Sequence, residues 1–529
     1  MEFSVEQNAI FEYAQKGVMN LIVQAVAGAG KTTTLVECTN RIKPDKRILL
    51  LAHNRSTRDT LKQKIGEKEN VSVFTLHGLA WRMYTEHFED KPNINEEKYR
   101  NYVNKNMDTI ASDIYRCLSP SKKLIYKANV FDLIDKARFN LKQSEKEIRK
   151  LAEKKYGTPL IADETHLVAK ILKWGVENRE EVDYQDLLWY PSQLGYFTKR
   201  YLADIIMLDE AQDASLAQQD IVKRCMKRES RLFAFGDRRQ TINSWCGSDT
   251  ESFDHLKDSV EFRRPAIELP LSTNYRCGKK IIEYAKNFVD NNIHPRDDAE
   301  DGVVRHDVGL NEAKDGDMIL CRNIAPLMEV YRRGVANGQR MYFRGESLGK
   351  SLIIDTDCAT GDTIPEIIAS LKQRLISTWV FLTNENGVDE RETASDRRVM
   401  SLLDTIKTLE NLPKTVETRK DLEKFAKDVF SDEGRDGIQL STIHRAKGLE
   451  ADNVFIVCPS LVPSKLATLD WQIQEEKNLQ YVMCTRPKNS LNFISEKEIA
   501  PYMAFAEANS LYSDLKSIRE EITEIKWGQ

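Results

Sequence analysis

The sequence lacks any apolar run long enough to cross a membrane. Its first residues, Met1 to Glu6, show no basic segment followed by an apolar one, so we expect no signal peptide. The nine cysteines include no C-x-x-C pair. This absence argues against a zinc ribbon, an iron–sulfur cluster or a disulfide framework, and it is typical of a reducing compartment. We therefore expect a cytoplasmic protein without a membrane partner.

The sequence also has only a small excess of one charge over the other. The 78 Lys and Arg residues nearly balance the 82 Asp and Glu residues, which leaves a formal net charge of −4. A near-neutral total neither indicates nor excludes a nucleic acid partner, because a basic groove can be local. Hydrophobic residues make up 41% of the 529 positions, and the sequence shows no internal repeat. This length and composition predict about three to four domains with buried cores.

The most informative stretch is AVAGAGKT, residues 25–32, which follows the apolar residues Leu21–Val23 and precedes a helical segment. A strand, a glycine-rich turn and Lys-Thr at a helix start are typical of a phosphate cradle, in which backbone N–H groups approach phosphate oxygens. Lys31 would reach the β- and γ-phosphates, and the Thr32 hydroxyl would hold Mg²⁺. Because Ala25 stands where the general pattern has glycine, a structural glycine turn is the alternative on this motif alone.

A second acidic motif, Asp209-Glu210, ends the apolar run Ala203–Leu208. In a phosphoryl-transfer site Asp209 would belong to the Mg²⁺ shell, and Glu210 would orient or deprotonate the attacking water. The alternative is an acidic helix cap, which the phosphate cradle upstream makes less attractive. The two motifs together predict an ATPase.

Strands alternate with helices on both sides of these motifs, which predicts parallel α/β sheets. Polar residues at the carboxyl ends of such strands lie where these sheets bind ligands, and Asn54 and His77 follow two of them. For His77, a helix-capping or core role is the alternative. The strands that we expect, besides the two above, are 47–52, 71–74, 231–235, 317–321, 438–441 and 454–457.

Two stretches interrupt the alternation. Residues 81–201 show helical periodicity, which predicts a helical insertion, and the Lys/Arg-rich part at 146–155 is interleaved with glutamates like a solvated helix face. Residues 346–436 are mixed, and within them the charged run 384–398 is expected to be a loop. Helices are expected around 399–411 and 418–430.

Nine blocks occur in a characteristic order: VEQNAI, AVAGAGKT, LLAHN, TLHGLA, LDEAQD, GDRRQTINSW, TNYR, STIHRAKGLE and LQYVMCTRPK. In this order they resemble the superfamily 1 helicases of the UvrD/Rep/PcrA type, from Ser4 to about Ile494 except in the two insertions. The phosphate loop of that family commonly has alanine at the position of Ala25. The resemblance implies an α/β fold with two RecA-like parallel-sheet P-loop NTPase domains in tandem, each with an inserted, mainly helical subdomain.

The resemblance also implies domain boundaries. Residues 1–85 and 200–275 would form the first motor domain with the ATP site, and 86–199 its helical insertion. Residues 276–345 and 437–529 would form the second motor domain, and 346–436 a second insertion that is smaller than in the best-known members. Since only about 35 residues follow the last motif, we expect no appended nuclease domain.

For ATP, the resemblance implies that Gln7 reads the adenine, Tyr275 stacks on it and Glu450 contacts the ribose. Gln240 would sense the γ-phosphate, which Arg276 and Arg486 would bind from the far side of a cleft. The implied catalytic set is Lys31, Glu210, Gln240, Arg276 and Arg486, and the implied Mg²⁺ ligands are Thr32 and Asp209. The remaining nucleotide-binding positions are Ala25, Val26, Ala27, Gly28, Ala29, Gly30 and Thr33, the last of which replaces an arginine common in the family.

For DNA, the resemblance implies that Trp245 stacks on a base, a contact that grips a single strand without reading sequence. Asn243 and Cys246 replace a tyrosine and an arginine that flank this tryptophan in the family, and Ala52 replaces an aromatic residue. The residues implied to touch the DNA backbone are Asn54, Thr75, His77, Thr442 and His444.

The implied function is an ATP-dependent DNA helicase or translocase that moves 3′→5′ on single-stranded DNA and separates duplexes in replication, repair or recombination. The block Lys447–Glu450 favours 3′→5′ movement, since the opposite branch usually has Ser-Gln-Gly-Ser-Glu there. ATP and Mg²⁺ would be the cofactors, and single-stranded DNA and junctions of single and double strands the partners. Single-strand-binding or loading proteins are further candidate partners, and the protein would associate with the nucleoid of a prokaryotic or phage-infected cell.

Three alternatives stay open. The chain could be a translocase that strips bound proteins and unwinds poorly without a partner, as the small second insertion suggests. It could be an ATP-gated binding module without motor action, although the complete catalytic set argues against this. RNA could be the substrate, because contacts with the backbone and stacked bases do not exclude it.

Overall fold

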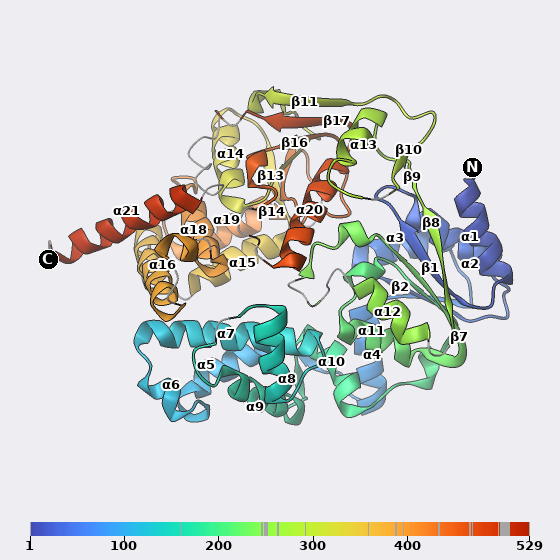
Figure 1. Ribbon diagram of the computed structural model, residues 1–529, viewed down its shortest axis with the longest axis horizontal. Coiled ribbons are helices and arrows are strands. Elements are labelled where there is room, and N and C mark those ends of the chain that lie inside the picture. The colour runs from blue at the N-terminus through green and yellow to red at the C-terminus, as the bar shows by residue number, and fades with distance from the viewer. Residues whose placement is uncertain are drawn as a thin grey trace. The chain divides into compact units, whose positions relative to one another are not determined.

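The chain divides into two compact units, Met1–Asn274 and Tyr275–Gln529. The computed structural model describes residues 2–158, 160–244, 247, 252–261, 264–290, 292–357, 359–386, 389–394, 396–431, 434–464, 467, 469–495, 497 and 508–527. The division falls one residue before the boundary expected after residue 275. Each unit contains a parallel sheet covered by helices (Figure 1).

The first sheet has the strand order β3-β2-β6-β7-β1-β8, and every pair in it is parallel. Its central strands are apolar and buried, as expected for a sheet with helices on both faces. Because β1, β7 and β6 are neighbours, the residues that follow them meet at one edge of the sheet. The strands are β1 Asn20–Ala25, β2 Ile48–Ala52, β3 Val71–Thr75, β6 Ala203–Leu208, β7 Met226–Gly236 and β8 Ala266–Leu271.

The helices around this sheet begin where the sequence supplies caps. Helix α1 starts with a capping box, in which the Ser4 hydroxyl accepts from the Gln7 N–H and the Gln7 side chain accepts from the Ser4 N–H. The helices are α1 Val5–Lys16, α2 Lys31–Arg41, α3 Arg55–Ile65, α4 Leu76–Phe88, α11 Leu216–Arg224 and α12 Ser252–Glu261, with short 3₁₀ turns η2 Lys199–Tyr201, η3 Ala211–Asp213 and η4 Arg238–Gln240.

The region between α4 and β6 is helical, as predicted, apart from a small parallel pair of strands. The exposed side chains of Lys146, Lys150 and Lys154 confirm the solvated face that the interleaved charges indicated. The elements are β4 Asn93–Ile94, α5 Lys98–Ile110, α6 Asp113–Cys117, α7 Pro120–Phe139, α8 Glu145–Lys150, the π-helical turn η1 Leu151–Lys155, α9 Glu164–Glu177, β5 Glu181–Val182 and α10 Tyr184–Leu194.

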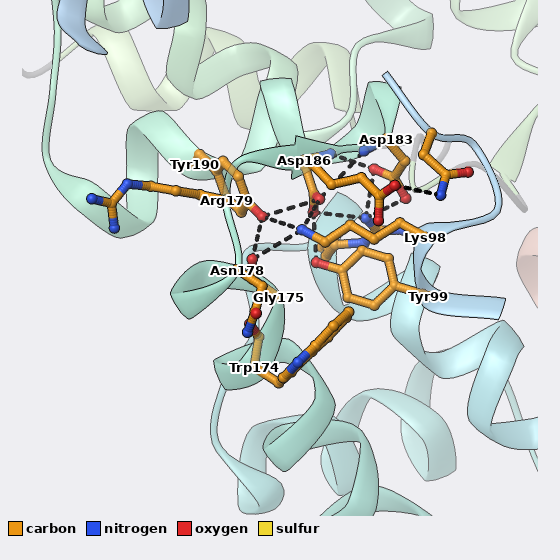
Figure 2. A network of polar contacts seen from close by, with 12 residues as sticks. Lys98, Tyr99, Trp174, Gly175, Asn178, Arg179, Asp183, Asp186 and Tyr190 are labelled. Atoms are coloured by element: carbon orange, nitrogen blue, oxygen red, sulfur yellow. Dashed lines mark hydrogen bonds and ion pairs between the residues drawn. The ribbon is translucent and has the colours of Figure 1, made fainter. Parts of the chain in front are cut away.

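A buried polar network joins the helices of this insertion (Figure 2). Arg138 of α7 donates to Asp183 and Asp186 at 2.7 and 2.9 Å, and the Tyr99 hydroxyl of α5 donates to Asp186 at 2.6 Å. Burial, followed by the charge of Asp186, raises the pKa of Asp183 to about 6. The Lys98 ammonium donates to Asp186, Tyr190 and the Gly175 carbonyl. Since each buried charge has partners, the network fixes α10, the last helix before β6.

The second sheet has the order β11-β17-β16-β12-β15-β13-β14, again with parallel pairs throughout. Its strands are β11 Val303–Val308, β12 Met318–Cys321, β13 Met341–Arg344, β14 Phe430–Ser431, β15 Ile438–Thr442, β16 Ala451–Ile456 and β17 Pro487–Ile494. Other elements of this unit are α13 Lys279–Ala285, β10 His294–Pro295, η6 Leu310–Glu312, α14 Ile324–Ala336, η7 Pro459–Leu461 and α20 Asp470–Cys484, whereas β9 Thr273–Asn274 ends the first unit.

The second insertion is a group of helices between β13 and β14, and the expectation of a loop at 384–398 is wrong in part. The helix α17 lies inside that run because the Trp379 indole donates to the Glu390 carbonyl at 2.9 Å and the Thr383 and Thr393 hydroxyls meet at 2.8 Å. These contacts come from the preceding helix and outweigh the weak hydrophobicity of the run. The helices are α15 Glu346–Asp357, α16 Ile364–Asn386, α17 Glu390–Thr393, α18 Arg397–Glu410 and α19 Arg419–Val429.

The helix α21, Ala508–Trp527, packs on α16 and α17 of this insertion, which the sequence analysis did not foresee (Figure 1). Leu511 and Leu515 are fully buried there, and Lys372 pairs with Glu521 at 3.0 Å. Within the part of the chain that the structure describes, every helix is too short or too polar to span a lipid bilayer.

Candidate functional site

The turn between β1 and α2 has the backbone of an anion-binding loop. Gly28 and Gly30 adopt φ values of 66° and 76°, which residues with a Cβ atom rarely adopt. Gly30 is the N-cap of α2, and no side chain caps the first amides of this helix in the described residues. Such amides and the helix dipole attract phosphate. Ala25 is a fully buried strand residue, so its methyl group packs in the sheet and leaves the loop free.

Lys31, the first residue of α2, lies beside three acidic side chains. Its ammonium contacts a carboxylate oxygen of Glu210 at 2.7 Å. Burial alone would lower the pKa of Lys31, but the charges of Glu210, Asp209 and Asp237 outweigh it, and the net shift is upward. Glu210 itself has a φ of 51°, in the left-handed region that residues other than glycine rarely adopt and that is often found at functional sites.

Asp209 has the properties of a cation ligand. Its side chain is buried, and its Oδ1 atom has no hydrogen-bond partner among the described residues. Burial, followed by the charge of Glu210, raises its pKa to about 7. A divalent cation would supply the missing partner and favour the charged carboxylate. Thr32, at the second position of α2, adds a hydroxyl oxygen, so the residues present fit Mg²⁺.

Gln240 is held by a buried acid that follows β7. The Gln240 amide donates to Asp237 Oδ2 at 2.8 Å, and the Arg239 N–H donates to Oδ1 at 3.0 Å. Burial raises the pKa of Asp237, although the Gln240 hydrogen bond and the Lys31 charge oppose the shift. The sequence analysis did not single out Asp237. Its position as a polar residue at a strand end, inside the block GDRRQ, could have identified it.

Gln7 reaches the phosphate loop from α1. Its amide nitrogen donates to the Thr34 hydroxyl of α2 at 3.1 Å, and its oxygen completes the α1 capping box. Gln7 is only 5% exposed, so it is not a plain surface residue. The structure therefore places an amide beside the loop, while its role toward adenine stays a prediction.

Two helix starts lie at the carboxyl ends of β2 and β3. Asn54 caps α3 by accepting from the Thr57 N–H at 2.8 Å, and Thr75 caps α4 by accepting from the Gly78 N–H at 3.1 Å. His77 is therefore not the cap of α4, and its side chain is half-buried. Helix starts of this kind suit phosphate groups.

His77 is uncharged at neutral pH and has an aromatic neighbour. Burial, then the neighbouring His53 and Arg55, lower its pKa to about 4. The ring of Tyr184, at the start of α10, lies edge-on to it with centroids 6.3 Å apart and is 40% exposed. The sequence analysis missed Tyr184, because only the fold brings α10 to α4. Trp245, the predicted base-stacking residue, lies outside the described residues.

In the second unit, Arg276 and Arg486 meet at Thr485. Arg276 pairs with Glu450 at 2.7 Å and donates to the Thr485 carbonyl at 3.1 Å. Arg486 is 1% exposed and donates to the Thr485 hydroxyl at 3.1 Å and to the Leu449 carbonyl at 3.2 Å. Burial would raise the pKa of Glu450, but Arg276 lowers it. Both arginines are thus held by their own unit.

The other predicted residues of this unit lie near the ends of strands. Thr442 is the last residue of β15, and its hydroxyl accepts from the Arg445 N–H at 3.4 Å. His444 belongs to the turn that follows, and Tyr275 is 39% exposed. The structure therefore gathers Lys31, Asp209, Glu210 and Gln240 in one unit, and Arg276, Glu450 and Arg486 in the other. Their roles toward ligands stay predictions.

Two family models match this chain. The UvrD/REP helicase N-terminal domain matches residues 4–261, and the UvrD-like helicase C-terminal domain matches residues 362–498. A probable DNA helicase II homolog of Mycoplasma pneumoniae is 24% identical over 298 residues, which cover 51% of this chain and 39% of that protein. The ATP-dependent DNA helicase PcrA of Staphylococcus epidermidis is 21% identical, with 96% of this chain and 86% of that protein covered. The ATP-dependent DNA helicase Rep of Buchnera aphidicola is also 21% identical, over 59% of this chain and 66% of that protein.

Proposed function

This chain belongs to the UvrD/Rep family of ATP-dependent DNA helicases, and we propose that it moves 3′→5′ along single-stranded DNA and separates duplexes. The observation that carries the proposal is the contact of Lys31 with Glu210, beside the buried Asp209, at one edge of the first sheet. ATP hydrolysis requires a phosphate loop, a cation ligand and a general base close together, and these residues are candidates for each.

The chemistry follows from these positions. The loop amides and Lys31 bind the β- and γ-phosphates of ATP, and Glu210 orients the attacking water and accepts its proton. Thr32 and Asp209 would hold Mg²⁺, which would supply positive charge to the phosphate oxygens. Gln240, fixed on Asp237, responds to the γ-phosphate.

The motor action needs both units, which we take to be RecA-like domains in tandem. ATP binds between them, Gln7 reads its adenine, and Tyr275 stacks on the same base. Arg276 and Arg486 bind the γ-phosphate and draw the domains together, because guanidinium groups stabilise the charge of the transition state. Since Arg276 is paired with Glu450 in this structure, that ion pair opens when Arg276 turns to the phosphate and Glu450 to the ribose.

The DNA grip uses residues at strand ends in each unit. Thr75 and His77 at the start of α4, with Asn54 at the start of α3, contact the backbone phosphates from the first unit, and Thr442 and His444 do so from the second. Because His77 is neutral, it binds as a hydrogen-bonding group rather than as a cation. The exposed Tyr184 offers a stacking surface for a base, and the family resemblance assigns the same contact to Trp245; such stacking tolerates every sequence.

The proposed cellular role rests on the resemblance to the family. Replication, repair or recombination is the proposed process, and single-strand-binding or loading proteins are the proposed partners. The bacterial relatives support a cytoplasmic enzyme, and we propose that it associates with the nucleoid.

The direction of movement is tested with tailed duplexes. The protein is mixed with ATP, Mg²⁺ and a short duplex that carries a single-stranded tail at either the 3′ or the 5′ end, with a blunt duplex as control. We expect the 3′-tailed substrate to be separated at least about 10-fold faster than the 5′-tailed one, since a motor loads on the tail and moves toward the duplex. Faster separation of the 5′-tailed duplex would overturn the proposed polarity.

The small second insertion favours a second candidate, a translocase that strips bound proteins and unwinds poorly without a partner. It predicts rapid displacement of streptavidin from biotinylated single-stranded DNA, together with negligible separation of either tailed duplex. Separation of the 3′-tailed duplex by the protein alone would exclude it.

A further inference from the structure

Gln212 bridges the ends of two neighbouring strands in the first unit. It lies in the turn η3 directly after β6 and has no exposed surface. Its amide nitrogen donates to Glu210 Oε2 at 2.6 Å, and its amide oxygen accepts from the Asp237 N–H at 3.1 Å. One side chain therefore connects the carboxylate at the end of β6 to the backbone at the end of β7.

The bridge completes a chain of polar contacts across the site. The Lys31 ammonium contacts Glu210 Oε1, and Gln212 holds the other oxygen of the same carboxylate. From Gln212 the chain continues through Asp237 to the amide of Gln240, which donates to the Asp237 carboxylate at 2.8 Å. The phosphate-binding lysine and the proposed γ-phosphate sensor are thus joined through Gln212.

The backbone beside Gln212 is shaped for this close approach. A Cβ atom on Gly236, the last residue of β7, would overlap Gln212 Oε1 and lie 2.7 Å from the Phe253 ring. Glycine at this position lets the strand end approach the amide, so the amide has little room to take another orientation. This packing supports a fixed role for Gln212 independently of its hydrogen bonds.

We propose that Gln212 is a positioning residue, which holds the Glu210 carboxylate for the attacking water and couples it to the Gln240 turn. The proposal rests on the function proposed above. Lys31 cannot serve Glu210 and the ATP phosphates with the same geometry, so the carboxylate loses this partner when ATP binds. Gln212 remains, and because an amide is neutral it orients the carboxylate without neutralising its charge.

Two variants test this role by the separate measurement of kcat and KM for ATP. Gln212→Leu removes the hydrogen bonds with Glu210 and Asp237, and a longer one to Asp213 at 3.4 Å, and we expect kcat on saturating single-stranded DNA to fall by about 30-fold. Gln212→Glu keeps the acceptor for the Asp237 N–H but replaces the donor to Glu210 with a second acid, so we expect an equal or larger loss. KM should stay within about 3-fold in both, because the phosphate loop and Lys31 are untouched.

Gln219→Leu is the matched control. Gln219 of α11 is also a buried amide, at 1% exposure, but it donates to the carbonyls of Ala214 and Ser252. We expect its kcat to stay within about 3-fold of wild type, with a thermal unfolding midpoint lowered at least as much as that of the Gln212 variants.

A kcat for Gln212→Leu within about 3-fold of wild type would overturn the proposal, as would equal losses in the Gln212 and Gln219 variants. The ratio of the Gln212→Leu kcat to the wild-type kcat is also measured without DNA. If the wild type hydrolyses ATP but does not respond to DNA, the proposed function is contradicted. The ratio without DNA then still tests the role of Gln212.

Discussion

Glu210→Gln is expected to lower ATP turnover on single-stranded DNA by about 10³-fold, the largest effect of any single substitution in this account. The amide has nearly the same shape as the carboxylate but cannot accept the proton of the attacking water. It can still accept a hydrogen bond from Lys31, which lies 2.7 Å from the carboxylate. The variant should therefore bind ATP with near-normal affinity, measured by fluorescence of a labelled ATP, while steady-state phosphate release is lost.

Glu37→Gln is the control for this substitution. Glu37 lies on α2, pairs with Arg41 at 2.6 Å and is away from the phosphate loop, so turnover should stay within about 2-fold of wild type. A Glu210→Gln variant that keeps more than about one tenth of wild-type kcat would show that another group handles the water.

Lys31→Ala should weaken ATP binding as well as turnover. The Lys31 ammonium is the positive charge that faces Glu210, Asp209 and Asp237, and without it these acids would repel the triphosphate. Removing one partner of a buried charge cluster leaves the others uncompensated, and we expect the Kd for labelled ATP to rise by about 100-fold or more. Equilibrium titration with labelled ATP measures this change directly.

Lys16→Ala removes a lysine that is exposed and pairs with Glu12 on the surface of α1, so its ATP affinity should match that of wild type. If Lys31→Ala binds ATP as tightly as Lys16→Ala, the triphosphate does not lie on the loop between β1 and α2.

That Lys31, Asp209 and Glu210 lie together could be predicted from the sequence because the segments that carry them are local. AVAGAGKT and LDEAQD each combine an apolar strand with the residues that follow it, and parallel strands place such ends together without further information. The helical insertion was also predictable, since periodicity reports burial on one face of a helix.

Contacts between distant segments were not predictable. The Arg276–Glu450 pair joins residues 174 positions apart, and Gln212 becomes important only because β6 and β7 are neighbours. The helix α17 forms in a charged run because α16 supplies partners for it. Sequence patterns report local propensity, whereas these features depend on which elements the fold brings together.

The central claim, that this ATPase is driven by single-stranded DNA, is tested most directly by the ATP turnover of the wild-type protein with and without single-stranded DNA. Single-stranded RNA of the same length serves as a third condition, and Glu210→Gln gives the background. We predict that DNA raises turnover by about 10-fold or more and that RNA does not. Turnover that is high without nucleic acid and unchanged by DNA would contradict the claim. Stimulation by RNA alone would contradict it too and would show that RNA is the substrate of the motor.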